Sequence, residues 1–305
     1  MQLVCFAPKV STGSGPRIGA LLPGGAQVLD LARAVDPDGS APAQSEWYDL
    51  GGDWLPRAMT YYRVHAAKLA AGTVIARPGS LHARSDVELL APVPRPAKLI
   101  CIGLNYRDHA AESKMPVPTS PITFSKYVTS VQRPGGPIVL PSTSTQVDYE
   151  AELAVVIGRR AKHVSREDAY GYVLGYTNLN DVSARDFQFA DKQWQRGKSC
   201  DTFAPMGPAI VTSDEIPDPN ALRIALRLNG QTMQDSSTEQ LIFKVDELVA
   251  FLSETVTLEP GDVIATGTPP GVGFARTPPV FLKPGDLVEV EVERLGVLSN
   301  PVAAE

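Results

Sequence analysis

The sequence predicts a β-rich α+β protein with a small N-terminal domain and a larger second domain. Short apolar runs bounded by glycine and proline recur along the 305 residues, a pattern typical of strands joined by tight turns. Two stretches, 54–71 and 246–255, carry apolar residues at helical spacing. Prolines at 92, 94 and 96 interrupt any regular strand, so we place the boundary there, between domains of residues 1–95 and 97–305.

Composition and charge exclude several classes of protein. The formal net charge is −6 and no long run of lysine and arginine occurs, which argues against a nucleic-acid partner. No apolar window of about eighteen residues suggests a membrane span, and residues 1–6 do not resemble a signal peptide. The cysteines, Cys5, Cys101 and Cys200, are scattered and fit a reducing compartment. We therefore expect a cytoplasmic protein with no membrane partner.

The first domain contains no convincing catalytic grouping. The apolar runs at 4–6, 17–22 and 26–31 predict a small β-meander. The helix at 54–71 follows, and 85–91 reads as a strand that leads into the proline-rich boundary.

The second domain begins with an apolar strand at 98–103, followed by a short helix at 106–114. His109 and Glu112 share one face of that helix, because residues three apart are neighbours on a helical surface. A histidine oriented by a carboxylate is the usual general base, although a simple surface pair would give the same spacing. Prolines at 116, 118 and 121 keep this helix short, which would suit a lid over a site.

The remaining segments continue the mixed pattern. We expect strands at 121–126, 138–141, 171–178, 263–267 and 287–293, a hairpin at 222–234 and a helix at 246–255. Ser165 and Asp168 have capping-box spacing, which predicts a short helix at 166–170.

An acidic stretch gives the strongest chemical signal. Asp148, Glu150 and Glu152 project from one face of a predicted strand, because strand side chains alternate between faces. Asp181 follows a later strand, where a rigid element can present it to a site. These carboxylates indicate either a site for a hard divalent cation or a half-exposed strand that meets water.

Two further segments carry candidate ligand-binding groups. Lys198, in a Gly/Ser context, could neutralise a carboxylate or a developing oxyanion, or could be a solvated loop lysine. The loop 268–273 begins with Thr268 and offers open backbone amides. Such a loop can hold a substrate carboxylate, although a plain tight connection would look the same.

Four motifs in the second domain resemble the fumarylacetoacetate hydrolase superfamily. They are Gly103-x-Asn105-Tyr106-x-Asp108-His109, Asp148-Tyr149-Glu150-x-Glu152-Leu153, Asn180-Asp181-Val182-Ser183-Ala184-Arg185-Asp186 and Thr266-Gly267-Thr268-Pro269-x-Gly271-Val272-Gly273. The resemblance covers about residues 97–302 and keeps the family's motif order. It is nearest to the fumarylacetoacetate hydrolase domain-containing branch, which includes acylpyruvate hydrolases and oxaloacetate decarboxylases.

The resemblance implies a β-roll catalytic domain, a homodimer and a Mg²⁺ or Mn²⁺ cofactor. By motif, the metal ligands fall on Glu150, Glu152 and Asp181, the catalytic groups on His109, Glu112 and Lys198, and the substrate-binding groups on Gln188 and Thr268. Asp148 is not a ligand in this branch. The role of Arg185 and Asp186 stays open between shaping the metal loop and tying a strand end to a dimer interface.

These assignments imply a metal-dependent hydrolase that cleaves a C–C bond in acylpyruvate-type 2,4-dioxo acids through a metal-bound pyruvate enolate. His109, oriented by Glu112, would activate water, and Lys198 would steady the oxyanion. The same site would also suit an oxaloacetate decarboxylase, or an isomerase or decarboxylase of aromatic ring-cleavage products. A non-catalytic, metal-stabilised dimer is disfavoured, because it would not require His109, Glu112 and Lys198 together.

Overall fold

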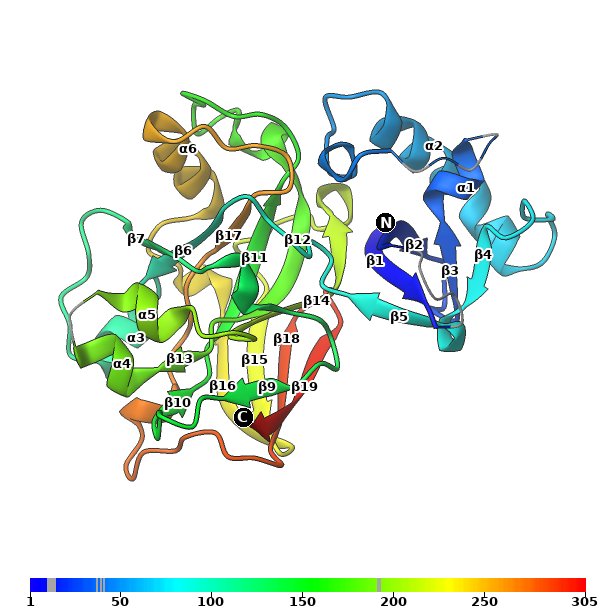
Figure 1. The fold of residues 1–305 in the computed structure, drawn as a ribbon. Coiled ribbons are helices and arrows are strands. Elements are labelled where there is room, and N and C mark those ends of the chain that lie inside the picture. The colour runs from blue at the N-terminus through cyan, green and yellow to red at the C-terminus, as the bar shows by residue number, and fades with distance from the viewer. Residues whose placement is uncertain (10–14, 37, 39, 41, 191–192) are drawn as a thin grey trace.

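The computed structural model describes residues 1–9, 15–36, 38, 40, 42–190 and 193–305. Figure 1 shows the N-terminal strands and helices, coloured blue to cyan, beside a larger β-rich body. None of the helices in the described part of the chain combines the length and apolarity that a membrane crossing requires.

The N-terminal part is the predicted meander with two helices. Its strands are β1 (Gln2–Pro8), β2 (Arg17–Leu21), β3 (Gln27–Asp30), β4 (Leu81–Ala83) and β5 (Val87–Leu90). The first four pair antiparallel in chain order, and β5 pairs with β1. The helices are α1 (Leu31–Val35) and the predicted α2 (Trp54–Ala70). Apolar residues of α2, such as Leu55 and Leu69, are buried in one core with Leu3 and Leu29.

The main sheet runs on from the N-terminal part into the second. Among the described residues it has twelve strands, with the path β4-β3-β2-β1-β14-β12-β11-β17-β6-β7. The further strands are β6 (Leu99–Gly103), β7 (Ile122–Ser125), β8 (Val131–Gln132), β11 (Ala151–Ile157), β12 (Val173–Asn180), β14 (Ala204–Thr212) and β17 (Val263–Ala265). β1 joins β14 through the pairs Gln2–Val211 and Leu3–Ile210. The sheet is therefore continuous between residues on either side of the proline-rich segment 92–96.

A second sheet packs on the first. Its strand order is β16 (Gln231–Ser237), β15 (Arg223–Leu228), β18 (Leu287–Val292), β19 (Val297–Ala304) and β9 (Ile138–Leu140). The predicted hairpin turn forms at Asn229 and Gly230, whose φ angles of 53° and 81° suit an Asn-Gly connection. Leu153 of β11, Ile224 of β15 and Val290 of β18 belong to one buried cluster. The core of this part therefore lies between the two sheets.

Short helices cover the open end of the main sheet. They are α3 (Arg107–Glu112), α4 (Arg185–Ala190) and α5 (Trp194–Lys198), while α6 (Val245–Thr255) buries Leu248, Val249 and Leu252. In Figure 1, α3, α4 and α5 gather on one side of the body, close to the small ladder of β10 (Val147–Asp148) and β13 (Ser183–Ala184).

The helix predicted at 166–170 is wrong. Ser165 Oγ does bond the Asp168 carboxylate at 2.8 Å and accepts from the Asp168 N–H at 3.2 Å. The backbone nevertheless forms a turn and then a 3₁₀ helix, Ala169–Tyr172, immediately before β12. The side-chain bonds are satisfied by a turn, and too few residues remain before the strand to propagate an α-helix.

Candidate metal centre

A cavity of about 250 Å³ opens beside the end of β11. Every site residue predicted from the sequence lines it except Glu112, which lies behind His109. The lining residues with polar groups are His109, Ser113, Glu150, Glu152, Asp181, Arg185, Gln188, Lys198 and Thr268. Residues from five separate segments of the chain therefore converge on one space.

The three predicted metal ligands lie together at this cavity. Glu150 occupies a break between β10 and β11, Glu152 lies in β11, and Asp181 follows β12. The antiparallel pairing of β11 with β12 places Ala151 opposite Asn180, and the Asp181 N–H donates to the Glu150 carbonyl at 2.9 Å. One carboxylate oxygen from each residue lies within 4.8 Å of the others, and all three are buried. The alternative of a half-exposed acidic strand is wrong.

Lys198 and Arg185 balance part of this negative charge. Lys198 Nζ donates to Glu150 at 2.7 Å and to Asp181 at 2.8 Å, and Arg185 lies 2.7 Å from Glu150. Lys198 is only 2% exposed, so it is not a solvated loop lysine. Burial alone would raise the pKa of Glu150, but Lys198 and Arg185 outweigh it and lower this pKa from 4.5 to about 2.

Glu152 lacks such compensation in the protein itself. Burial raises its pKa well above the ordinary value, and the charges of Asp181 and Glu150 raise it further. Its Oε2 accepts a hydrogen bond from the Gly267 N–H at 2.8 Å. A bound divalent cation would supply the missing positive charge, and three carboxylates are the oxygen ligands that hard cations prefer. The donor set therefore fits a divalent ion.

Asp148 has a different role from the acidic residues that follow it. The strand breaks after Asp148, whose carboxylate accepts from the backbone N–H groups of Gly273 at 2.7 Å and Phe274 at 3.1 Å. It also pairs with Arg185, whose Nε lies 2.9 Å away. Asp148 therefore holds the loop 268–274 and Arg185 in place. Arg185 also contacts Glu150 at 2.7 Å, so this arginine lies beside a predicted metal ligand.

The histidine and glutamate of α3 form the predicted pair. His109 Nδ1 lies 3.1 Å from Glu112 Oε2, and the Gly271 N–H donates to Glu112 Oε1 at 2.9 Å. Burial raises the pKa of Glu112, but the hydrogen bonds from His109 and Gly271 outweigh it, so the net shift is downward. His109 is buried and lines the cavity, unlike a histidine in a surface pair.

The two predicted substrate-binding residues have partners inside the protein. Gln188 Oε1 accepts from Arg185 at 2.9 Å. Thr268 Oγ1 accepts from Gln234 Nε2 at 2.9 Å, and the same amide donates to the Pro269 carbonyl. Gln234 Oε1 in turn accepts from the Ala151 N–H at 2.8 Å, so it ties the Thr268 loop to β11.

Sequence reasoning missed Gln234 and Lys126. Lys126 is buried, forms an ion pair with Asp181 Oδ1 and donates to the Val182 carbonyl at 3.0 Å. The position of Lys126 directly after the strand Ile122–Ser125 was the available signal, since a lysine buried there requires a counter-charge. Gln234 carried no local signal.

Comparison with known proteins identifies the family. The family model described as fumarylacetoacetate (FAA) hydrolase C-terminal matches residues 98–303. The chain belongs to the fumarylacetoacetate hydrolase family. The match begins where the predicted second domain begins, and it includes all eight predicted site residues.

Similar members of the family come from animals and bacteria. The chain is 47% identical to oxaloacetate tautomerase fahd2, mitochondrial, of Xenopus laevis, over 99% of this chain and 90% of that protein. It is 46% identical to the human oxaloacetate tautomerase FAHD2A, mitochondrial, over 99% and 91%. Both names place those proteins in mitochondria, which does not fit the cytoplasmic expectation for this chain.

Solved structures share the fold. A fumarylacetoacetate hydrolase from Exiguobacterium antarcticum has a TM-score of 0.80 at 34% identity, with full coverage of both chains. A 2-hydroxyhepta-2,4-diene-1,7-dioate isomerase from Mycobacterium marinum has a TM-score of 0.74 at 34% identity, covering 100% of this chain and 99% of that one. The predicted β-rich α+β fold of this enzyme family is confirmed.

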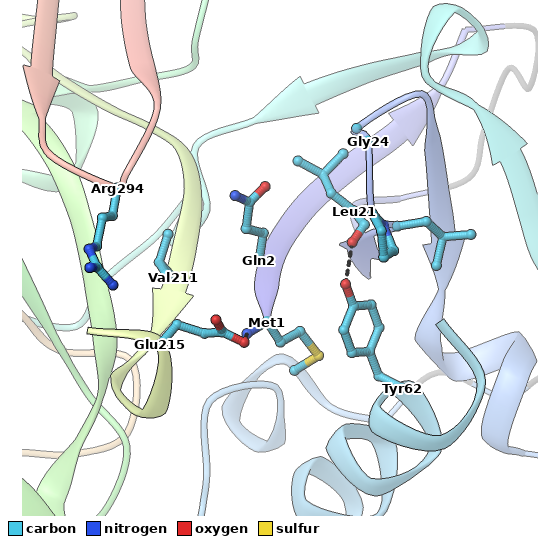
Figure 2. A pocket seen from close by; sticks show the side chains of 11 residues that line it. Met1, Gln2, Leu21, Gly24, Tyr62, Val211, Glu215 and Arg294 are labelled. Carbon is cyan, nitrogen blue, oxygen red and sulfur yellow. Dashed lines mark hydrogen bonds and ion pairs between the residues drawn. The ribbon is translucent and has the colours of Figure 1, made fainter. Parts of the chain in front are cut away.

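A larger hollow lies away from these residues. It is a groove of about 510 Å³. In Figure 2, Glu215 and Arg294 lie on one side of it and Tyr62 and Leu21 on the other. Tyr62 donates to the Leu21 carbonyl at 2.6 Å. Within the described ranges, the acidic cluster able to hold a metal is at the smaller cavity. The candidate functional site is therefore the smaller one.

Proposed function

We propose that this chain is a divalent-metal-dependent enzyme that interconverts the enol and keto forms of a 2-oxo acid, with oxaloacetate as substrate. The relatives named oxaloacetate tautomerases support this assignment, since they match nearly the whole chain at 46–47% identity. The observation that carries it is the position of His109, which lines the same cavity as Glu150, Glu152 and Asp181.

The residues divide the work of a proton transfer. A divalent ion held by Glu150, Glu152 and Asp181 would act as a Lewis acid that stabilises negative charge on the 2-oxo oxygen. Thr268 binds the substrate carboxylate, and Gln188 orients the substrate. His109 exchanges a proton with C3, while Glu112 holds the imidazole in one orientation. Lys198 places a positive charge beside the developing enolate.

We propose Mg²⁺ or Mn²⁺ as the ion and a homodimer as the assembly. Carboxylate oxygens suit both ions, so the donor set does not favour one over the other. The first 95 residues then form an N-terminal domain and residues 97–305 the catalytic domain, although the main sheet joins them through β1 and β14.

C–C bond hydrolysis of acylpyruvates is the second candidate. His109 and Glu112 would then take a proton from the attacking water, and Lys198 would steady the oxyanion formed by that attack. The relation to a fumarylacetoacetate hydrolase at a TM-score of 0.80 favours this alternative. Decarboxylation of oxaloacetate would use the same enolate and no attacking water, so it differs in the bond that breaks.

One screen separates these reactions. The purified protein is incubated with Mg²⁺ or Mn²⁺ and with enol-oxaloacetate, acetylpyruvate or fumarylpyruvate, and the products are identified by NMR. We expect faster loss of the enol signal with oxaloacetate, no release of CO₂ above the blank, and strong loss of rate in His109→Gln. The matched control is His163→Asn, at an exposed residue whose φ of 53° suits asparagine. Cleavage of an acylpyruvate without enol–keto exchange would overturn the tautomerase assignment.

A further inference from the structure

The cavity has an apolar wall that a short diacid does not use. This wall is formed by Met115, Ile122, Phe124, Phe189, Trp194 and Phe274, which are among the apolar residues that line the cavity. They come from the segment after α3, from β7, from α4 and α5, and from the loop that follows β17. Such a wall belongs to a site that binds an apolar group.

Two aromatic pairs lead away from the charged groups. Phe124 lies beside Lys198, with Nζ 5.2 Å from the ring centroid, and packs edge-on against Trp194 at 5.5 Å. Phe274 lies 4.4 Å from the Arg185 guanidinium and packs edge-on against Phe189 at 5.9 Å. One pair therefore starts beside Lys198 and the other beside Arg185. We call the part of the cavity around these cations and the three carboxylates the inner site, and both pairs extend away from it.

The wall continues to the protein surface. Phe189 is 55% exposed and Met115 is 50% exposed, although both line the cavity. Exposed large apolar side chains gathered at a cavity mouth commonly mark a ligand-binding surface. A ligand that reached from the metal ligands to these residues would remove both side chains from water.

Charge balance also favours an apolar far end. Among the described lining residues the basic side chains are Arg185, Lys198 and His109. Each of them already contacts a carboxylate. A carboxylate placed farther out than oxaloacetate reaches, against the aromatic wall, would lose hydration without gaining a free cation among these groups. A phenyl or alkyl group at the same place would gain free energy from leaving water.

Gly103 keeps Trp194 in this wall. A Cβ atom built on Gly103 would overlap the Cζ3 atom of the Trp194 ring, and Ile122 lies next to the same position. The glycine of the Gly103-x-Asn105 motif therefore has a packing reason, which is to let the indole ring of Trp194 approach the end of β6.

We propose that the site also tautomerises 2-oxo acids that carry an apolar group on C3, with arylpyruvates as the substrate class. This inference rests on the proposed enol–keto activity. The 2-oxo acid end would occupy the inner site, and the aryl group would lie between the Phe124–Trp194 and Phe189–Phe274 pairs. The reaction is balanced without another reactant. In the enol-to-keto direction the enol O–H bond breaks and a C3–H bond forms, and the reverse direction restores the enol.

The test compares two substrates in one protein. Enol–keto exchange of phenylpyruvate and of oxaloacetate is followed by ultraviolet absorbance with Mg²⁺ or Mn²⁺ and wild-type protein. We expect acceleration of both, with kcat/KM values within about tenfold of each other. Acceleration of oxaloacetate alone would overturn the inference and leave the proposed function standing. Acceleration of neither would overturn both, while phenylpyruvate alone would support the inference and reject oxaloacetate as substrate.

Variants of the wall separate specificity from general damage. Trp194→Ala and Phe189→Ser should each lower kcat/KM for phenylpyruvate about tenfold more than for oxaloacetate. Phe189→Ser serves if Trp194→Ala does not fold, because Phe189 is exposed and contributes little to the core. The control is Ile75→Ser, at a residue 96% exposed and outside the cavity lining, which should leave both rates unchanged. Equal losses on both substrates in the two wall variants would overturn the role of the wall.

Discussion

Lys126 and Asp181 form a fully buried ion pair, with both side chains inaccessible to water. The second oxygen of Asp181 accepts from Lys198 at 2.8 Å, so two lysines share one carboxylate. Asp181 lies after β12 and Lys126 after β7, which are at different places in the main sheet. This pair thus links the predicted metal ligand to the sheet edge.

Removing Lys126 should destabilise the protein strongly. Lys126→Met would leave one oxygen of a buried carboxylate without its partner, so we expect the free energy of unfolding to fall by about 3–5 kcal/mol. Urea denaturation measures this loss. The matched variant is Arg63→Met, whose partner Asp214 is exposed, and its loss should be about 0–1 kcal/mol. Equal losses in the two variants would show that the buried Lys126–Asp181 pair contributes no more to the free energy of unfolding than an exposed ion pair does.

Glu150→Gln should abolish the response to metal. The substitution keeps the shape of the side chain but removes one of three charges that would hold the ion. Wild-type protein should gain about 2.7 kcal/mol of stability at an ion concentration one hundred times Kd, and the variant should gain little. Thermal melts in a Mg²⁺ or Mn²⁺ titration measure the difference. Glu167→Gln, at an exposed residue on a turn, should respond like wild type.

Glu112 should make the free energy of unfolding depend on pH in the acidic range. Its pKa is lowered in the folded protein by the hydrogen bonds from His109 and Gly271, which outweigh burial. The unfolded state therefore binds more protons below the ordinary pKa of 4.5, so this stabilisation is present above that pH and is lost as the pH falls through the folded pKa. The stability difference between wild type and Glu112→Gln, from urea denaturation, should shrink on acidification. A constant difference would contradict the assignment.

Gln234→Leu should weaken substrate binding indirectly, through the position of Thr268, because Gln234 itself does not contact the substrate. Its amide spans Ala151, Thr268 and Pro269, so the variant leaves a buried N–H and a buried carbonyl without partners. We expect a loss of about 1–3 kcal/mol in stability. We also expect KM to rise more than kcat falls, because Thr268 would lose its orientation. The matched control is Gln240→Leu, at a half-buried residue that ends the 3₁₀ helix Thr238–Gln240 and does not line the cavity. A fall in kcat at constant KM would count against a positioning role.

Local patterns predicted much of the secondary structure. The β-meander, α2, α6, the Asn229–Gly230 hairpin and the short helix that bears His109 are all observed. Each depends on periodicity, turn chemistry or proline, which act over a few residues. The helix at 166–170 was wrong because its capping bonds are equally satisfied by a turn.

Pairs of distant residues could not be read in the same way. Asp148 and Gly273 are 125 residues apart, and Gln234 and Thr268 meet from different strands and loops. Their contacts depend on which strands become neighbours, and strand order and register are set by packing of the whole sheet. Gly273, Gln234 and Thr268 gave no periodic signal, and the alternation that included Asp148 did not indicate its partner.

By itself, the sequence determined the chemical groups of this protein: an acidic strand, a later aspartate, a His–Glu pair on one helical face and the motifs of its family. Only the tertiary structure decided how they are neutralised and arranged. It assigned Asp148 to the loop, placed Lys126 and Lys198 on Asp181, and built the aromatic wall. The reason is physical, because alternation and helical spacing are local, whereas charge balance in a buried site requires charged partners from β11, from α4 and α5, and from the segments after β7 and β12.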